Sequence, residues 1–123
     1  MPDSMINELQ KDLQCEHILD CMYGLKSLDK KCYKIILDSN NPVTSSHIAT
    51  EVDRDASTVS RSLNRLIDSE LIYKEKRTLS NGYEYVYDNR NIDEIIQSME
   101  ELVSNWEQKI NLLINEFESK YSN

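Results

Sequence analysis

The sequence predicts a mostly α-helical fold with one small β-hairpin. Three observations lead to this fold class. Apolar residues recur every three or four positions in five segments, which is the spacing of helices with one buried face. Two segments rich in aromatic and β-branched residues flank the dipeptide Asn81-Gly82, a common hairpin turn. Only two glycines and two prolines occur among 123 residues, so the chain contains few breaks.

The first two helices are predicted over residues 3–23 and 29–39. Gly24 suits the C-terminal cap of the first helix, because glycine adopts a left-handed conformation at little cost. The second helix has Asp29 in its first turn and stops before Asn40-Asn41-Pro42. The expected apolar stripes are Ile6, Leu9, Leu13, Ile18, Leu19 and Met22 on the first helix and Leu28, Cys32, Ile35 and Ile36 on the second.

Two further helices, separated by a tight turn, follow. Thr44 or Ser45 is predicted to cap a short helix, and Asp55 to cap a helix over residues 56–69. Residues 53–55 form the connection between them. The second of these helices has an apolar face of Val59, Leu63, Leu66 and Ile67 and an opposite polar face of Ser57, Ser60, Arg61, Asn64 and Arg65.

Residues 71–77 and 83–87 are predicted to form the two strands of the hairpin. Side chains alternate between the two faces of a sheet, so Tyr83, Tyr85 and Tyr87 are expected on one face. Three basic residues lead into the hairpin tip, namely Lys74, Lys76 and Arg77.

The C-terminal segment is predicted to form one long helix, capped by Asn89 or Asn91 and ending near Tyr121. Its apolar residues are separated by alternating steps of four and three, which is the heptad spacing of a coiled coil. A stripe of this length predicts a homodimer, with the N-terminal helix joining the interface. Packing of the stripe on the subunit's own core is the alternative. The predicted interface residues are Ile92, Ile96, Met99, Val103, Trp106, Ile110, Leu113 and Phe117.

Charge is unevenly distributed along the chain. The net charge of −8 is unusual for a protein that binds nucleic acid. Residues 24–90 hold 11 basic and 10 acidic residues, a balance of +1, whereas residues 1–23 and 91–123 together hold 3 basic and 12 acidic residues, a balance of −9. We predict that residues 1–23 are an N-terminal interface helix, residues 24–90 a DNA-binding domain and residues 91–123 a C-terminal dimerisation helix. The centre can present a basic face while the flanks repel anions.

The order of helix, short helix, turn, helix and hairpin is that of a winged helix-turn-helix, and it predicts a sequence-specific, DNA-binding regulator of transcription. The helix over residues 56–69 has a buried face that fixes it and a polar face that can enter the major groove. Arginine can bind guanine and asparagine can bind adenine, while hydroxyl groups near a helix N-terminus can bind phosphate. The hairpin is expected to touch the backbone or the minor groove. The predicted DNA-binding residues are Ser45, Arg54, Ser57, Thr58, Ser60, Arg61, Asn64, Arg65, Lys74, Lys76 and Arg77.

These segments, in this order, resemble the TrmB/MarR-like winged-helix regulators that are common in archaea. The resemblance covers residues 24–88, and its specificity lies in the order and spacing of the segments. The matching segments are the opening helix, Gly24–Leu37, with its Gly-Leu, acidic and Tyr positions in register; the helix-turn-helix, Ile48-Ala49, Ser57–Leu63 and Leu66; and the wing, Lys74–Arg77 and Gly82–Tyr87.

The resemblance implies a recognition role for the polar residues of the helix over residues 56–69. Two departures from the family limit what it implies. Glu70 stands where the family often has glycine after this helix, and a non-glycine residue in a left-handed cap costs about 1 kcal/mol, so the helix is expected to end differently. The C-terminal sensor domain of the larger TrmB regulators is not visible, so sugar binding is not implied and any effector is left open. The recognition residues by resemblance are Ser57, Thr58, Ser60, Arg61, Asn64 and Arg65.

A winged-helix module that contacts protein without binding DNA is the alternative function, and the acidic flanks favour it. An enzyme is not expected, because the sequence has no glycine-rich phosphate loop, metal-ligand cluster or Ser/His/Asp signature. We therefore predict no cofactor and no metal. The lack of an apolar signal core or a long apolar segment predicts no membrane contact and a cytoplasmic location.

Three cysteines, Cys15, Cys21 and Cys32, follow no CxxC pattern and are odd in number. A disulfide framework is therefore not expected. They are interpreted as buried structural thiols, with redox sensing and metal binding as the alternatives.

Overall fold

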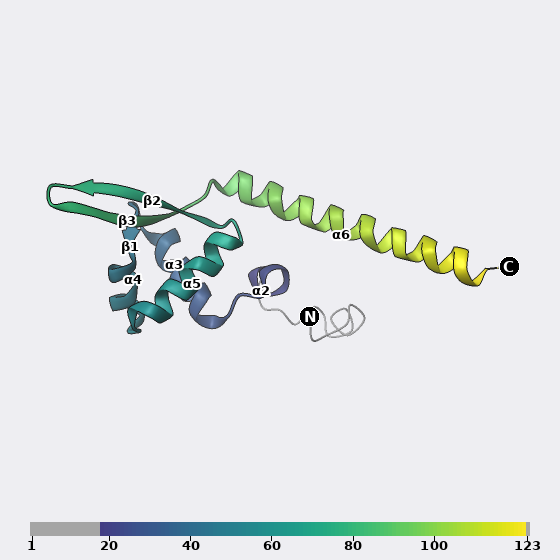
Figure 1. Ribbon diagram of the computed structural model, residues 1–123, viewed down its shortest axis with the longest axis horizontal. Helices are drawn as coiled ribbons and strands as arrows, with labels where there is room; N and C mark the ends of the chain where they lie inside the picture. The colour runs from purple at the N-terminus through teal and green to yellow at the C-terminus, as the bar shows by residue number, and fades with distance from the viewer. Residues whose placement is uncertain (1–17, 123) are drawn as a thin grey trace. The chain divides into compact units, whose positions relative to one another are not determined.

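The computed structural model describes residues 18–122 in two compact units, one ending at Asn89 and the other beginning at Arg90 (Figure 1). The part of the predicted first helix that precedes residue 18 lies outside the described residues. In chain order the elements are α2 (Ile18–Tyr23), α3 (Ser27–Asp38), β1 (Val43–Thr44), α4 (Ser45–Val52), α5 (Ala56–Asp68), β2 (Ile72–Leu79), β3 (Gly82–Asn89) and α6 (Ile92–Tyr121).

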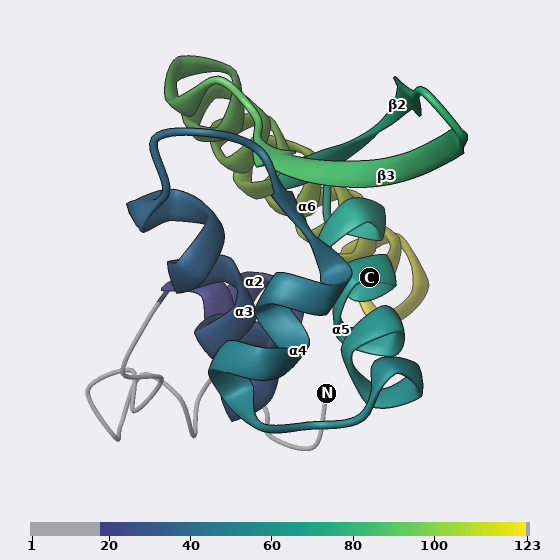
Figure 2. The same cartoon turned by 90° about the vertical axis from the view of Figure 1, so that its left-hand side faces the viewer.

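The first unit is built on three helices, α3, α4 and α5, which pack together beside a small sheet (Figure 2). The apolar spacing along each helix closes this core. Ile36 of α3, Ile48 of α4 and Leu63 of α5 are at most 2% exposed. Complete burial of side chains of this size contributes about 1.5–3 kcal/mol each, so these contacts hold the three helices in fixed positions.

The helix starts are set by side chains that accept hydrogen bonds from free backbone N–H groups. Thr44 caps α4, Asp55 caps α5 and Asn91 caps α6. Asp55 is the predicted cap, and Thr44 and Asn91 are each one of the two alternatives that the sequence predicts. α3 begins at Ser27, two residues before the predicted start at Asp29. The earlier start is stabilised because the Asp29 carboxylate accepts a hydrogen bond from the backbone N–H group just before the helix.

The sheet has three antiparallel strands in the order β1-β3-β2. The short strand β1 was not predicted. Its two residues, Val43 and Thr44, pair with Tyr87 and Val86 of β3. Two residues are too few to show the alternation by which a strand is found in a sequence. This pairing attaches the start of α4 to the base of the hairpin.

The hairpin turn lies one residue earlier than predicted. Ser80-Asn81 forms the turn, and Gly82 is the first residue of β3, paired with Leu79. Gly82 has a φ of +145°, a conformation that other residues rarely adopt. The predicted alternation of three tyrosines on one face is retained. The shift changes their partners on β2, so that Lys76 lies opposite Tyr85.

The second unit is α6, a single helix of 30 residues whose bounds agree with the prediction. Most of its heptad residues are exposed within a single chain. Six of the predicted interface side chains are 48–65% exposed, namely Ile92, Ile96, Val103, Trp106, Leu113 and Phe117.

Among the described residues, no helix combines the length and the continuous apolar character that a membrane crossing requires.

Two cysteines lie within the described residues, and Cys15 lies outside them. Cys32 is a buried free thiol on α3, as predicted, and burial raises the pKa of this thiol, which disfavours the reactive thiolate. Cys21 is disulfide-bonded, so the prediction of a thiol at this position is wrong. Disulfide formation depends on the approach of two side chains in space, which the spacing of cysteines along the chain does not reveal.

α5 ends in a left-handed residue that is not glycine. Glu70 has a φ of +61°, and its N–H group donates to the carbonyl of Ile67 at 2.9 Å. The N–H group of Leu71 donates to the carbonyl of Leu66 at 3.1 Å. These two bonds form the Schellman cap that usually has glycine at this position. The expectation that Glu70 makes the helix end differently is therefore wrong, because burial of Leu71 and both hydrogen bonds hold the strained residue in place.

We expect Glu70→Gly to raise the free energy of unfolding by about 0.5–1 kcal/mol, because glycine removes the strain of a β-carbon at positive φ. Glu70→Ala is the matched control, since it removes the same carboxylate and keeps the β-carbon. Urea unfolding of the two variants at one protein concentration measures the difference. Equal stabilities would show that the backbone at this position carries no strain.

Candidate nucleic-acid interface

α5 has one buried apolar face and one exposed polar face, as predicted. Val59, Leu63 and Leu66 are fully buried and attach the helix to the core. A helix held in this way can enter a groove with its other face while its position stays fixed. The exposed residues of the predicted recognition set are Ser57, Ser60, Arg61, Asn64 and Arg65, while Thr58 is half-buried.

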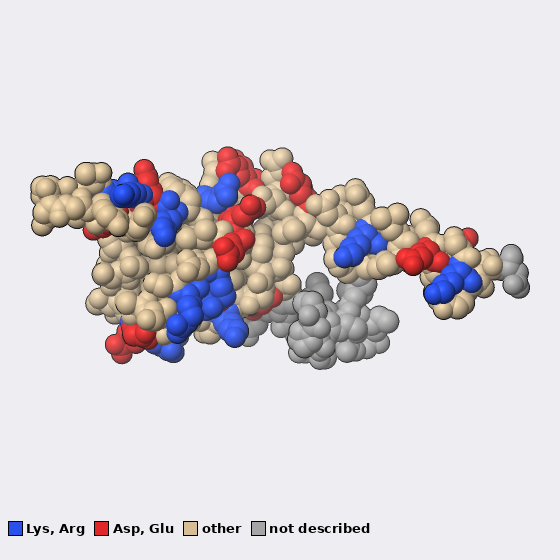
Figure 3. Space-filling view, viewed as in Figure 1, with Lys and Arg blue, Asp and Glu red and all other residues tan. Residues whose placement is uncertain are grey.

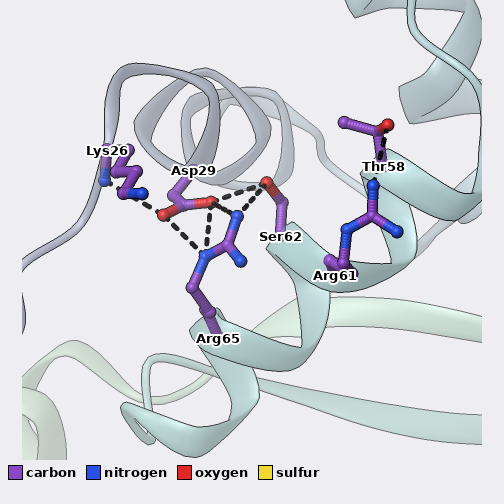
Figure 4. Close-up of polar contacts among 6 residues, drawn as sticks. All are labelled: Lys26, Asp29, Thr58, Arg61, Ser62 and Arg65. Carbon is purple, nitrogen blue, oxygen red and sulfur yellow. Dashed lines mark hydrogen bonds and ion pairs between the residues drawn. The ribbon is translucent and has the colours of Figure 1, made fainter.

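Three side chains are linked in a row at the N-terminus of α5. Asp55 accepts hydrogen bonds from the hydroxyl of Thr58 at 2.5 Å and from its backbone N–H at 3.3 Å. Arg61 Nη2 in turn donates to the Thr58 hydroxyl at 3.3 Å (Figure 4). The bonds from Thr58 and the nearby charge of Arg61 lower the pKa of Asp55. Arg61 therefore lies along the helix surface in an exposed contact that a stronger acceptor can replace.

Arg65 lies differently from the other polar residues of α5, because its side chain extends to α3 (Figure 4). Its Nε lies 3.1 and 3.0 Å from the two carboxylate oxygens of Asp29, and its Nη2 lies 2.8 Å from Asp29 Oδ1. Nη2 also donates to the hydroxyl of Ser62 at 3.3 Å. That hydroxyl donates to Asp29 Oδ1 at 2.6 Å. Two of the three guanidinium nitrogens are thus engaged within the protein.

Asp29 is completely buried, whereas the side chain of Arg65 is 46% exposed. Burial by itself raises the pKa of Asp29. The hydrogen bonds from Arg65, Ser62 and the Lys26 backbone, together with the charge of Arg65, outweigh burial and bring the pKa below its usual value of 3.8. Asp29 is therefore ionised at neutral pH and ties the first turn of α3 to the middle of α5.

The two predicted residues of α4 and the following turn lie at opposite ends of that helix. Ser45 is the first residue of α4 and is half-buried. Arg54 is exposed in the turn between α4 and α5. Asp53, in a left-handed conformation, ends α4, and the N–H group of Arg54 donates to the carbonyl of Ala49 at 3.2 Å. These bonds fix the tight turn that the sequence predicts.

The three basic residues of the hairpin fall on two different faces. Lys74 Nζ lies 4.3 Å from the ring centre of Tyr85, and Lys76 Nζ lies 4.1 Å from that of Tyr83. The two rings meet edge to face with centres 5.7 Å apart. Cation–π contacts at an exposed site contribute about 0.5–1 kcal/mol each, which favours the placement of the two lysines over the rings. We call this exposed group the lysine–tyrosine face, consisting of Lys74, Lys76, Tyr83 and Tyr85.

Arg77 follows Lys76 directly and therefore points to the opposite face of the hairpin. It lies across from Glu84, with 3.7 Å between Arg77 Nη1 and a carboxylate oxygen of Glu84. Its charge is locally balanced, whereas Lys74 and Lys76 lie over tyrosine rings. Figure 3 shows basic side chains of this unit in two places, over the hairpin and over the packed helices.

Three residues of this interface were missed as functional candidates. Tyr83 and Tyr85 were assigned to one sheet face but were not considered together with the lysines, although the same alternation places Lys74 and Lys76 beside them. Asp29 was placed in the first turn of a helix. No local pattern could show that it pairs with a side chain 36 residues later.

Residues 19–93 match the model of a protein family described as "Sugar-specific transcriptional regulator TrmB". An uncharacterized protein of Methanocaldococcus jannaschii is 31% identical over 110 residues, which cover 89% of this chain and 90% of that protein. A second uncharacterized protein of the same organism is 28% identical over 104 residues, which cover 84% of this chain and 78% of that protein.

Several solved structures are similar in fold. A possible transcriptional regulator from Methanosarcina mazei matches with a TM-score of 0.71 at 21% identity, over 86% of this chain and 87% of that chain. MepR of S. aureus, in a complex with DNA, matches with a TM-score of 0.55 at 16% identity, over 96% of this chain and 94% of that chain. At these identities the comparison establishes the winged helix-turn-helix fold.

We expect Asp29→Asn to lower the free energy of unfolding at neutral pH by about 2–3 kcal/mol, because it replaces a buried carboxylate oxygen that accepts hydrogen bonds with an amide NH₂ group that can accept none. The folded-state pKa of Asp29 is depressed, so its ionisation stabilises the fold above the unfolded-state pKa of 3.8. This contribution is lost as pH falls through the lower, folded-state pKa. The gap in stability between the wild type and the variant should therefore be full above about pH 5 and shrink below about pH 4.

Urea unfolding of both proteins across this pH range measures the gap. Asp38→Asn is a suitable control, because Asp38 forms an exposed ion pair with Lys34 on the same helix. Exposed pairs of this kind contribute about 0–1 kcal/mol. A gap for Asp29→Asn that is no larger than that of Asp38→Asn, or that persists unchanged at acid pH, would contradict the assignment of a buried ionised pair.

Proposed function

The chain belongs to the TrmB family of transcriptional regulators, and we propose that it acts by binding double-stranded DNA as a homodimer. The observation that carries the proposal is the division of α5, in which a fully buried apolar face fixes a helix whose opposite face is polar and exposed. The fold agrees with this role, since it is also the fold of MepR, whose structure contains DNA.

We assign base recognition to Arg61 and Asn64, which are exposed on α5. Both side chains suit the major groove, because arginine can donate to guanine and asparagine can donate to and accept from adenine. Ser57, Thr58 and Ser60 lie in the first turns of the helix and are suited to phosphate contacts. The exposed Arg54, in the turn before α5, is suited to the same backbone.

On the hairpin, we assign the backbone contact to the lysine–tyrosine face. Lys74 and Lys76 lie over neutral tyrosine rings, so their charges can attract phosphate, whereas the charge of Arg77 is balanced by the carboxylate of Glu84. The phenol groups of Tyr83 and Tyr85 are exposed and can donate hydrogen bonds to phosphate oxygens. This division gives the hairpin a DNA side and an opposite side.

The homodimer is supported by the stripe on α6. Burial of eight heptad side chains yields about 10–20 kcal/mol before the costs of association. Thirty residues of helix extend about 45 Å, which gives two copies a long surface for pairing. A twofold dimer has two recognition helices, so its operator should contain two related half-sites about one helical turn apart.

The acidic flanks favour the second candidate, a winged-helix module that contacts protein instead of DNA. The double variant Arg61→Ala and Asn64→Ala separates the two. Both residues are exposed, and neither belongs to the buried core of the first unit. If the chain is a DNA-binding regulator, the double variant no longer binds the operator but keeps its oligomeric state. If the chain contacts protein instead, the wild type itself binds no operator.

We expect genomic fragments to be bound with strong dependence on salt. If about 6–8 basic side chains per dimer touch phosphates, log K falls with log salt at a slope of about −5 to −7. A mobility-shift titration at several salt concentrations measures the slope, after footprinting has identified a bound fragment. A slope near zero, or no binding at low salt, contradicts the proposal.

The hairpin supplies a matched control in the same titration. Replacing Lys74 and Lys76 with alanine should make the slope less steep by about 0.9 for each phosphate that the protein no longer neutralises. Arg77→Ala removes a basic residue from the opposite face and should leave the slope nearly unchanged. An equal or larger effect of Arg77→Ala would assign the DNA contact to the other face of the hairpin.

We also expect the double variant Val103→Lys and Trp106→Lys to convert a dimer into a monomer in sedimentation velocity, because two charges in the stripe must otherwise be buried. Asn105→Lys, which adds a charge to the same exposed turn outside the stripe, is the control and should remain dimeric. A wild-type protein that sediments as a monomer, or a double variant that stays dimeric, would exclude this interface.

A further inference from the structure

We propose that Asp29 and Arg65 are positioning residues, and that their ion pair sets the orientation of the recognition face of α5 while Arg65 itself does not read bases. This inference rests on the proposed DNA binding. It departs from the prediction made for Arg65 from the sequence, in which both arginines of α5 were equivalent candidates for guanine.

The guanidinium group of Arg65 is held by hydrogen bonds within the protein. Nε and Nη2 lie 2.8–3.1 Å from the carboxylate oxygens of Asp29, and Nη2 also donates to the hydroxyl of Ser62. Bidentate recognition of guanine needs two N–H groups presented side by side to the base edge. One two-pronged edge of the guanidinium group, formed by Nε and Nη2, faces Asp29, which is 0% exposed. The other edge, formed by Nη1 and Nη2, can be presented to a base only if Nη2 gives up its bond to Ser62. Leaving a buried charge without its partner is strongly unfavourable, so the pair is expected to persist on DNA.

The carboxylate of Asp29 is itself held in place. Its Oδ2 also accepts the backbone N–H group of Lys26 at 3.0 Å, so the carboxylate is fixed to the start of α3. Ser62 and Arg65 approach it from α5, three residues apart on one side of the helix. Two anchors on one helix, both bound to one fixed group, restrict rotation of the helix about its axis.

The apolar face of α5 determines which side of the helix meets the core, but contacts between apolar side chains have little directional preference and allow small rotations about the helix axis. Arg61 and Asn64 lie on the same helix as the two anchors, so a rotation of α5 would move both relative to the bases. Catalytic and binding groups lose much of their effect when they are displaced by about 1 Å. The Asp29–Arg65 pair can therefore control affinity without touching DNA.

The experiment measures operator affinity, base preference and salt slope for Asp29→Asn, Arg65→Lys and Arg61→Ala, at a temperature at which circular dichroism shows each protein folded. We expect Asp29→Asn and Arg65→Lys each to lower operator affinity by about tenfold, with the base preference and the salt slope of the wild type. Arg65→Lys is informative because lysine retains a charge for phosphate but cannot form the two-pronged pair. Arg61→Ala should change the base preference at one position of each half-site.

Two results overturn the inference. A change in base preference or in salt slope for an Arg65 variant would show that Arg65 contacts DNA directly. Unchanged affinity for both folded variants would show that the pair stabilises the fold and does nothing more. Failure of the wild type to bind any DNA is different, because it refutes the proposed function itself.

A combined replacement covers the case in which the single variants do not fold. Asp29→Leu, Ser62→Ala and Arg65→Met together replace both ions and the buried hydroxyl that would otherwise lose its acceptor, an exchange of polar for apolar groups that proteins often tolerate. This triple variant should fold and bind with about tenfold lower affinity, the same base preference and the same salt slope. A new base preference, or a slope less steep by about 0.9 for each phosphate that Arg65 had neutralised, counts against the inference.

Discussion

Asp29 is an ionised carboxylate without solvent exposure, and the placement of α5 depends on it. An isolated buried charge is costly, so the surrounding structure must supply donors on every side. The donors come from three places, the Lys26 backbone, the Ser62 hydroxyl and the Arg65 guanidinium. They can meet only when the first turn of α3 lies against the middle of α5. The same contact that neutralises the charge thus fixes the helix that carries the candidate recognition face.

The residues of α5 fall into three groups, namely a buried face, the residues that bind Asp29 and an exposed face. Residues spaced by three and four positions share a face. Val59, Leu63 and Leu66 form the buried face, and Ser62 and Arg65 lie beside it and reach Asp29. The face that remains exposed is narrower than an amphipathic pattern suggests, since one of its five predicted residues is engaged with α3. Its candidate recognition residues are therefore Arg61, Asn64 and the two exposed serines, Ser57 and Ser60.

Interactions between residues that are close in the sequence could be predicted, whereas interactions between distant residues could not. Thr44, Asp55 and Asn91 cap their helices through bonds to residues two or three positions away, and such local patterns are legible in the sequence. The Asp29–Arg65 pair spans 36 residues and depends on helix packing that no local pattern encodes. The division of the hairpin is an intermediate case. Alternation alone places Lys74 and Lys76 with the tyrosines and Arg77 opposite them, but their partners across the strands required the turn at Ser80-Asn81, which was predicted one residue too late.

The charge distribution sets how the proposed regulator would hold DNA. The central segment, residues 24–90, has a balance of only +1, and four of its basic residues pair with carboxylates of the same unit, namely Lys30, Lys34, Arg65 and Arg77. Few basic side chains without a carboxylate partner remain to bind phosphate, so a single copy of the first unit should bind any DNA weakly. When α6 joins two chains, the binding of one copy of the first unit to DNA raises the local concentration of the other copy at its half-site. Weak contacts then suffice at a matched pair of half-sites, while the acidic flanks oppose binding elsewhere. In this arrangement the dimer helix is part of the specificity, because affinity appears only where both recognition faces find their site.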